Sequence, residues 1–438
     1  MQLNYSPSYS NNKANTGTYQ FDNITNTYSD FDTSLSNNFI NTVTSQTAGA
    51  TFRMGNINNF IAVGAAYQYT ELNSNQLFPA DTTLNRSFND VLPNFMWRTK
   101  LSAKANLRIF YRASLTAPAV TQLQNVINNS NPLFITTGNP GLKQEYGNTL
   151  AARYTFTNTE KGNSFFANIY LQQYNNYIGN SSFIATKDTA LNSTVTLFKG
   201  SQLTTPINVD GYVSARSFFT YGLPVSLIKS TVNLNAGFTW ARTPSVINNV
   251  SNLSNNYGYN TGVVIASNIS QYIDFTVSYN ATFNVVSNSI EPQLNSNYFA
   301  QNADIKFNLL SKKGWFLNND LSNQSYEGLT NGFNQSYWLW NLAIGKKFLT
   351  AQRGELKLSG FDLLNQNRSI TRTVTESSIE DDQNLVLTQY FMLSFTYTLK
   401  SFGNVPSARP GGGGGPGMGG GRPGGGFGGP AGPGGSSF

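Results

Sequence analysis

The stretch Asp274-Phe-Thr-Val-Ser-Tyr-Asn-Ala-Thr-Phe-Asn-Val-Val286 alternates polar and apolar side chains from its first residue to Val285. Successive side chains of a β-strand point to opposite faces, so the stretch predicts a strand with one apolar and one polar surface. Strands of soluble proteins usually run for about 5–6 residues. A tilted strand needs roughly 9–11 residues to cross a membrane, and this alternation is long enough. It therefore predicts a membrane-spanning strand in a closed barrel, where every backbone group is paired.

Similar alternating segments recur along the chain. One apolar face consists of Val232, Leu234, Ala236, Phe238 and Trp240. Trp338 and Trp340 begin another, and aromatic girdles at the two membrane interfaces would place such residues there, although ordinary core aromatics are the alternative. The predicted strands from residue 39 onward are 39–54, 58–72, 90–101, 105–116, 144–157, 164–178, 194–199 or nearby, 207–220, 229–242, 257–268, 273–286, 299–310, 315–327, 337–348, 354–365 and 389–400. Two weaker segments, near 1–9 and 16–26, precede them.

The connections between these strands alternate between two lengths. The short ones are 55–57, 102–104, 158–163, 221–228, 269–272, 311–314 and 349–353. The long ones are 73–89, 117–143, 179–206, 243–256, 287–298, 328–336 and 366–388. Barrels of the bacterial outer membrane have short turns on the periplasmic side and longer loops outside. The alternation therefore predicts an all-β, antiparallel, up-and-down transmembrane barrel.

The composition agrees with this fold class. Charged residues make up only 11% of the chain, against about 25% in soluble proteins, while 39% of the residues are hydrophobic and 13% aromatic. The mean hydropathy is −0.30, so the chain is polar through Asn, Ser and Thr. Neutral polar groups suit a water-filled lumen behind a lipid-facing wall. No stretch approaches the roughly 18 consecutive apolar residues of a transmembrane helix.

Several functional classes are disfavoured. The chain has no Cys and no His, which removes disulfides, thiolate chemistry and His-based catalysis, so we predict no enzyme, no cofactor and no metal site. Glu380, Asp381 and Asp382 lie together in a long connection, where a solvated turn or a weak calcium contact is favoured over catalysis. The net charge of +7 is spread over the whole chain, which argues against nucleic acid as a partner.

Two domains are predicted, a barrel over 1–402 and a Gly/Pro-rich tail over 403–438. Such a tail cannot bury enough apolar surface to offset its ordering entropy, so we expect it to be flexible. Its function is open, with a periplasmic tether as one possibility. The first residues show no signal peptide, so we expect either a processed chain or part of a longer one.

One motif resembles a known family. The segment Tyr111-Arg-Ala-Ser-Leu-Thr-Ala-Pro118 is followed by Gly138-Asn-Pro-Gly-Leu-Lys-Gln-Glu145. The pair resembles a pattern of TonB-dependent outer-membrane receptors of the Bacteroidetes type, except that Gln144 stands where the family usually has proline. The family-motif residues are Gly138, Asn139, Pro140, Leu142, Lys143 and Glu145. Asn139-Pro140-Gly141 predicts a turn, and the motif is interpreted as a structural corner with substrate contact as the alternative.

The resemblance implies a barrel of about 22 strands. About 16–18 of these strands are predicted here, so the N-terminal ones would be missing and the chain would be a fragment or truncated product. The final strand, with Phe391, Phe395 and Phe402, resembles the terminal assembly signal of outer-membrane barrels. Implied partners are outer-membrane lipid and the barrel-assembly machinery. Family members contact TonB through a plug and a TonB box, neither of which is found in this chain. The implied location is the outer membrane of a Gram-negative cell, with the tail in the periplasm.

Three hypotheses for function follow. The first is transport, as the barrel portion of a TonB-dependent receptor-like protein for an unidentified solute. The second is a passive, porin-like channel formed by this chain alone. The third is a structural or adhesive barrel without transport. The solute, the exact strand count and the oligomeric state are not encoded in any motif of the sequence.

Overall fold

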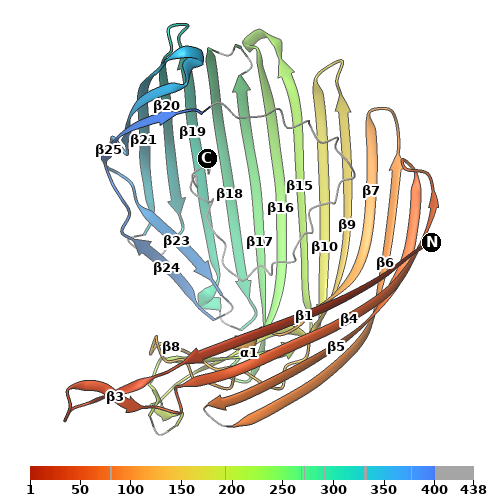
Figure 1. Cartoon of the computed structure of the whole chain (residues 1–438), viewed down its shortest axis with the longest axis vertical. Coiled ribbons are helices and arrows are strands. Elements are labelled where there is room, and N and C mark those ends of the chain that lie inside the picture. The colour runs from red at the N-terminus through yellow and green to blue at the C-terminus, as the bar shows by residue number, and fades with distance from the viewer. Residues whose placement is uncertain are drawn as a thin grey trace.

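The computed structural model describes residues 1–399 except 79–80, 193, 268, 271, 291, 330–332 and 376. Within these residues, sixteen strands form one curved wall (Figure 1). The strands of the wall are β1 (Gln2–Thr16), β4 (Asn37–Gly55), β5 (Phe60–Phe78), β6 (Thr82–Lys100), β7 (Ala105–Thr116), β9 (Glu145–Asn158), β10 (Asn163–Asn175), β15 (Tyr212–Val225), β16 (Ser230–Ile247), β17 (Val250–Ser267), β18 (Ile273–Asn288), β19 (Ser296–Leu310), β20 (Trp315–Glu327), β21 (Gln335–Phe348), β22 (Gly354–Phe361) and β25 (Tyr390–Tyr397).

Shorter elements occupy the connections. They are β2 (Tyr19–Asp22), β3 (Thr27–Phe31), α1 (Val120–Leu123), β8 (Phe134–Thr136), β11 (Tyr177–Ile184), β12 (Thr189–Ala190), β13 (Thr196–Leu197), β14 (Gln202–Val209), β23 (Ser369–Val374), β24 (Ile379–Asn384) and the 3-10 turns η1 (Ser226–Ile228), η2 (Pro292–Leu294) and η3 (Thr350–Gln352). Among the described residues, no helix is both long and apolar enough to cross a bilayer.

Successive strands of the wall pair antiparallel with one another, as the sequence predicts. Within the described residues, β1 pairs on one side with β4, and β25 pairs on one side with β22. The expected closure of the barrel is therefore not observed, and the wall is an open sheet. Closure links strand number, tilt and stagger. In Figure 1, β1, β4 and β5 run across the view at a steep angle to β15–β21, which leaves the two edges apart.

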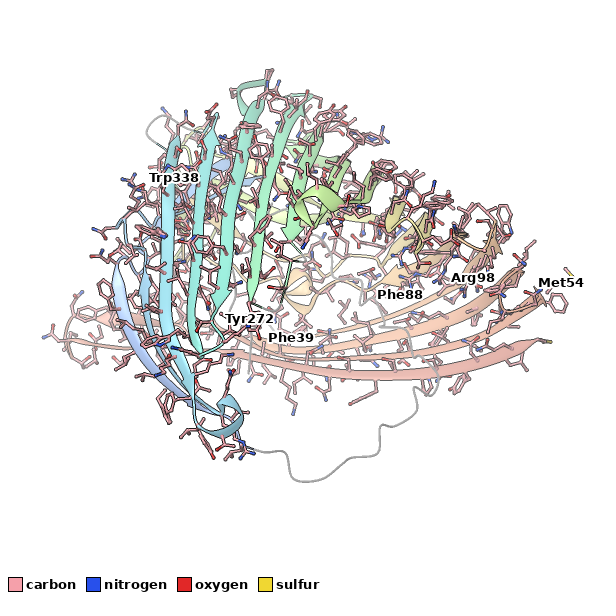
Figure 2. All side chains as sticks on the ribbon, turned by 90° about the horizontal axis from the view of Figure 1, so that it is seen from above. Phe39, Met54, Phe88, Arg98, Tyr272 and Trp338 are labelled. Carbon is pink, nitrogen blue, oxygen red and sulfur yellow. The ribbon has the colours of Figure 1, made fainter. Side chains whose placement is uncertain are left out.

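The register of β18 with β19 keeps the apolar and polar faces of the stretch 274–286 separate. On the apolar face, Val277 lies opposite Ile305 and Phe283 lies opposite Phe299. On the polar face, Ser278 lies opposite Asp304 and donates a hydrogen bond to its Oδ2 at 3.0 Å. Val277 and Phe283 are 38% and 42% exposed, so the apolar face is not covered by protein. Figure 2 shows side chains standing out on both faces of the sheet.

Two predicted strands belong to connections instead of the wall. Within 194–199, only Thr196 and Leu197 are in a strand, and it pairs with β12. Within 16–26, β2 ends at Asp22, which accepts hydrogen bonds from the Ile24 amide and the Thr25 hydroxyl, each at 2.8 Å. These bonds form a turn that sends the chain back into β3. The segment near 1–9 is part of the long strand β1.

The predicted alternation of connection lengths holds except at two of the predicted long connections, which are largely strand. The predicted connection 243–256 is the end of a hairpin in which β16 runs to Ile247 and β17 begins at Val250. Asn248 and Asn249 have φ of 48° and 66°, as a type I′ turn requires. The predicted connection 73–89 likewise lies mostly within β5 and β6. The predicted tail at 403–438 lies outside the described residues.

The buried apolar clusters lie mainly in the long connections and on the inner face. One cluster joins Leu72, Leu123, Leu142 and Ile178. A second joins Ile135, Ala185, Val195 and Leu197. A third joins Val286, Tyr298 and Leu329. Many apolar side chains of the wall face outward and are exposed, while the buried ones, such as Leu72, Val286 and Tyr298, pack with residues of the connections. The long connections therefore pack against one another at one end of the wall.

We expect the two faces of β18 to respond differently to charge. The variant Val277→Arg should lower the free energy of unfolding by about 2–4 kcal/mol, the cost of an arginine that meets lipid near the midplane. The variant Ser278→Arg should have a much smaller effect, because its side chain would lie beside Asp304 on the wet face. Denaturant unfolding of the protein in lipid vesicles measures both. Equal losses at the two positions would mean that the faces are assigned wrongly.

Candidate functional site

The inner face of the wall lines a cavity beside β16–β20, with a volume of about 450 Å³ and a surface formed by both apolar and polar side chains. Polar residues of its lining include Thr239, Asn260, Asn280, Thr282, Asn284, Asn302 and Gln324. Thr282 and Asn260 are already joined by a hydrogen bond of 2.8 Å between Thr282 Oγ1 and Asn260 Oδ1. Amide side chains both donate and accept hydrogen bonds. The cavity can therefore bind polar groups of a solute.

The hairpin of β23 and β24 covers one side of this cavity. Ile370, Thr371 and Arg372 of β23 contribute to the lining. Ile370 and Ile379 pack against the cluster of Val286, Tyr298 and Leu329 that belongs to the wall and its connections. Full burial of an aliphatic side chain contributes about 1.5–3 kcal/mol. Apolar packing thus holds the hairpin against the inner face.

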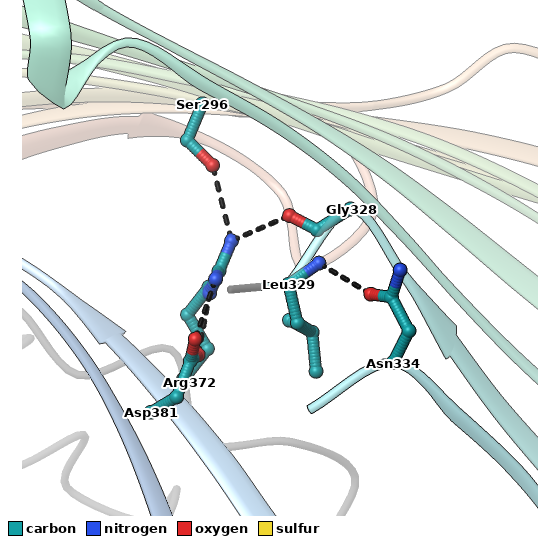
Figure 3. A network of polar contacts seen from close by, with 6 residues as sticks. All are labelled: Ser296, Gly328, Leu329, Asn334, Arg372 and Asp381. Atoms are coloured by element: carbon teal, nitrogen blue, oxygen red, sulfur yellow. Dashed lines mark hydrogen bonds and ion pairs between the residues drawn. The ribbon is translucent and has the colours of Figure 1, made fainter. Parts of the chain in front are cut away.

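Arg372, which forms a buried ion pair with Asp381 within the same hairpin, also fixes that hairpin to the wall (Figure 3). Arg372 donates through Nε and Nη2 to the two carboxylate oxygens of Asp381, each at 2.6 Å. Its Nη1 donates to Ser296 Oγ at 3.1 Å and to the Gly328 carbonyl at 2.8 Å. The two charged side chains are only 6% and 3% exposed. One guanidinium thus links the hairpin to the start of β19 and the end of β20.

Gly328 is suited to this contact by its backbone. Its φ of +79° lies in the left-handed region, and a Cβ there would clash with the Asn297 carbonyl. Leu329, the next residue, donates its amide to Asn334 Oδ1 at 2.7 Å (Figure 3). The connection after β20 is therefore shaped to present a carbonyl to Arg372.

The end of the hairpin reaches a second long connection. Ser377 Oγ accepts a hydrogen bond from Gln202 Nε2 at 3.0 Å and lies 3.4 Å from the hydroxyl of Ser182. Gln202 begins β14 and Ser182 belongs to β11, both in the connection between β10 and β15. The two long connections thus meet over the inner face.

The expected solvated turn at the acidic cluster is wrong for Asp381. Its carboxylate is buried against Arg372, whereas Asp382 is exposed. The pairing follows from the hairpin register, which places Arg372 directly opposite Asp381 across the turn at 375–378. Arg372 and Asp381 are equally distant from that turn along the chain. A hairpin predicted there from the sequence would therefore have paired them. Within the described residues, no group of three acidic, His or Cys side chains could hold a metal ion.

The first half of the family motif forms a tight corner. Gly138 lies against the backbone of Gln124, where a Cβ would clash. Asn139 donates its amide to the Gln122 carbonyl at 2.6 Å and its side chain to the Pro206 carbonyl at 3.0 Å. The turn through Pro140 and Gly141 closes by a 3.3 Å hydrogen bond from the Leu142 amide to the Asn139 carbonyl. The corner thus joins the connections on both sides of β9 and β10.

The second half of the motif leads into β9. Leu142 is 2% exposed and packs in the cluster that includes Leu72 and Ile178. The backbone of Lys143 exchanges hydrogen bonds with the Asn208 side chain. Glu145 is also buried, and its Oε1 accepts the Ile178 amide at 2.8 Å.

Gln144, which replaces the usual proline, donates to Asp90 Oδ2 at 2.8 Å. Each of these contacts of the motif joins one part of the chain to another. A contact between the motif and a solute stays a prediction.

The ion pair offers a direct test of whether the β23–β24 hairpin is held over the cavity. This hairpin is called the cover below. Asp381→Asn should detach the hairpin and leave the wall intact, because removing one partner of a buried pair costs about 3–5 kcal/mol. Faster proteolysis within 369–384 measures this loss, and the mobility shift of the unheated protein on gels reports the wall. Asp382→Asn is the matched control, since that neighbouring carboxylate is exposed. Equal protection in both variants would contradict the assignment.

The corner offers a second test. Gly138→Ala should destabilise the protein by about 1–3 kcal/mol, because a methyl group overpacks the site against rigid backbone. Gly141→Ala should change stability little, since its Cβ would meet only the Asn139 side chain, at 3.0 Å. Denaturant unfolding compares the two. A larger loss for Gly141→Ala would show that the corner is described wrongly.

Comparison with known proteins gives a family for the chain. The model of the outer membrane protein beta-barrel family matches residues 2–397. No curated protein matches the chain. A solved structure of FpvA from P. aeruginosa, bound to heterologous pyoverdines, is 10% identical, with a TM-score of 0.30. The match covers 90% of this chain and 64% of FpvA, so the chain spans less than two thirds of that protein.

A TM-score this low carries no argument about function. The family match is different, because it extends over all sixteen strands of the wall, from β1 to β25. It also agrees with the outward apolar face and the inward polar face. The protein therefore belongs to the outer membrane protein β-barrel family, a kind of protein that is typically not an enzyme and resides in the outer membrane.

Proposed function

We propose that this protein carries a polar solute across the outer membrane, as the barrel portion of a TonB-dependent receptor-like transporter. The observation that carries the proposal is the cavity on the inner face, which offers several amide and hydroxyl side chains to a solute and is covered by a hairpin that Arg372 ties to the wall. A wall that served only as an anchor would need no such cover. The receptor class is supported by the motif from Gly138 to Glu145 alone.

The hairpin that covers the cavity favours a gated path for the solute over a freely open pore. The β23–β24 hairpin and the connection between β10 and β15 meet through Ser377, so a solute from that end would meet loops before the cavity. We propose that this end faces the outside, because long connections of outer-membrane barrels lie there. The C-terminal tail would then begin on the periplasmic side.

Lipid and the assembly machinery are the partners that this function requires. The outward side chains of β25, including Phe391, Leu393 and Phe395, are 62–69% exposed and suited to lipid contact. Both open edges of the wall must also be paired in the membrane, because hydrocarbon offers no hydrogen bonds to a free strand edge. We propose that assembly of the barrel completes this pairing.

Vesicles that contain the full chain test transport and the cover together. The intact protein should admit small sugars slowly, and Asp381→Asn should admit them faster because the hairpin no longer covers the cavity. Asp382→Asn should behave as the intact protein. Swelling of the vesicles in isotonic sugar measures the rate. Fast, size-limited swelling already in the intact protein would favour the porin-like alternative, and folded protein that admits no sugar in any variant would favour a structural barrel.

A further inference from the structure

Three arginines form a row on the inner face of the wall. Arg98 of β6 lies directly opposite Arg108 of β7, and Arg108 lies directly opposite Arg153 of β9. The row continues in register through β10, β15 and β16 to Asn260, which lines the cavity beside β16–β20. All three arginines are therefore on the lumen side. The three arginines line a hollow with a volume of about 490 Å³, and Arg53 of β4 lines it as well.

This arrangement is unfavourable without a counter-charge. Like charges directly opposite one another on neighbouring strands repel and destabilise the sheet. Within the described residues, none of the four arginines forms an ion pair with an acidic side chain. The row thus concentrates positive charge that the described chain does not neutralise.

Two cations in the other half of the inner wall are paired with acids on the next strand. Lys306 lies opposite Asp320 and forms an ion pair with it at 3.1 Å. Lys347 lies opposite Glu355, with 3.9 Å between the charged atoms. The same sheet geometry therefore supports cross-strand pairing, and the arginine row departs from it.

Aromatic rings hold the guanidinium groups in place. Arg53 lies over Phe60 at 3.8 Å from the ring centroid, Arg108 lies 5.6 Å from Phe110, and Arg153 lies 5.4 Å from Phe166. Such contacts orient a cation without neutralising it. Planar guanidinium groups bind carboxylates and phosphates through two parallel hydrogen bonds. The row is thus arranged for an anion with several oxygens.

We propose that Arg98, Arg108 and Arg153, with Arg53, bind the carboxylate or phosphate groups of a multiply charged solute in the lumen. This inference rests on the proposed transport function and names its solute class. Phe60 and Met96 line the same hollow and offer apolar contact to the rest of the solute. The row lies near the short turns, since β6 ends at Lys100 and β7 begins at Ala105.

Calorimetry of the full chain in detergent tests the site, with inorganic tripolyphosphate and citrate as separate probes. The triple variant Arg98→Gln/Arg108→Gln/Arg153→Gln should bind the preferred probe at least about ten-fold more weakly, because several charge-assisted hydrogen bonds are lost. Tripolyphosphate binding alone would indicate a phosphate-bearing solute, and citrate binding alone a carboxylate-bearing one. Arg108→Lys keeps the charge but loses the paired donors, so its affinity should be intermediate.

The matched control is Lys306→Gln/Lys347→Gln/Lys357→Gln, which removes the same charge from the other half of the wall. It should leave the affinity nearly unchanged, and an equal loss in both triple variants would reduce the site to a general charge effect and overturn the proposal. No binding of either probe by the intact protein would also overturn it. If the arginine triple variant loses its heat-dependent gel mobility, the single variant Arg108→Gln takes its place in the comparison. Binding of the probes to the arginines does not require their passage through the barrel. The calorimetry therefore tests this site even if the vesicle-swelling experiment shows no transport.

Discussion

Backbone N–H and C=O groups have no water to bond inside a hydrocarbon layer, and this constraint governs the whole molecule. It explains why most of the described chain forms one sheet whose long strands pair with their neighbours along the sequence. It also fixes the side chains, since a strand that separates lipid from water must alternate. Val277 and Ser278 are adjacent in sequence but face opposite solvents. The free edges of β1 and β25 are the places where the constraint is not met within the described residues.

Because many apolar side chains of the wall face outward, the packed apolar clusters form mainly between the long connections and a few inward residues of the wall. They lie where long connections fold against one another and against the inner face, as with Leu142 beside Leu72 and Ile379 beside Val286. The stability of the wall and that of its cover therefore have separate origins. The wall depends on hydrogen bonds and lipid, and the cover depends on packing and one buried ion pair. A change in the cover can alter access to the lumen without unfolding the wall.

The charges of the lumen are organised by the register of the sheet. Cross-strand neighbours lie close enough to interact directly, so each inward charge is set against its partner on the next strand. Lys306 meets Asp320 and is neutralised, whereas Arg108 meets two further arginines. The same rule operates in the small hairpin, where Arg372 meets Asp381. Whether a cation is satisfied or available thus depends on the residue opposite it on the next strand.

The sequence by itself determined the fold class, the facing of the strands and most of the alternation of connection lengths, because these depend on local periodicity and on the solvent on each side. The exceptions are 73–89 and 243–256, where the strands run on almost to the turn. The sequence also located fifteen of the sixteen strands of the wall, and it placed a further segment over the N-terminal strand, β1. It could not show that 194–199 belongs to a connection, since short strands form wherever a partner is near. Only the tertiary structure decided that Gly138 abuts Gln124, that Arg372 reaches Ser296 and Gly328, and that three arginines share one row. These contacts join residues from separate strands and connections, and their geometry follows from how the wall curves and how its long connections fold inward, which no local pattern encodes.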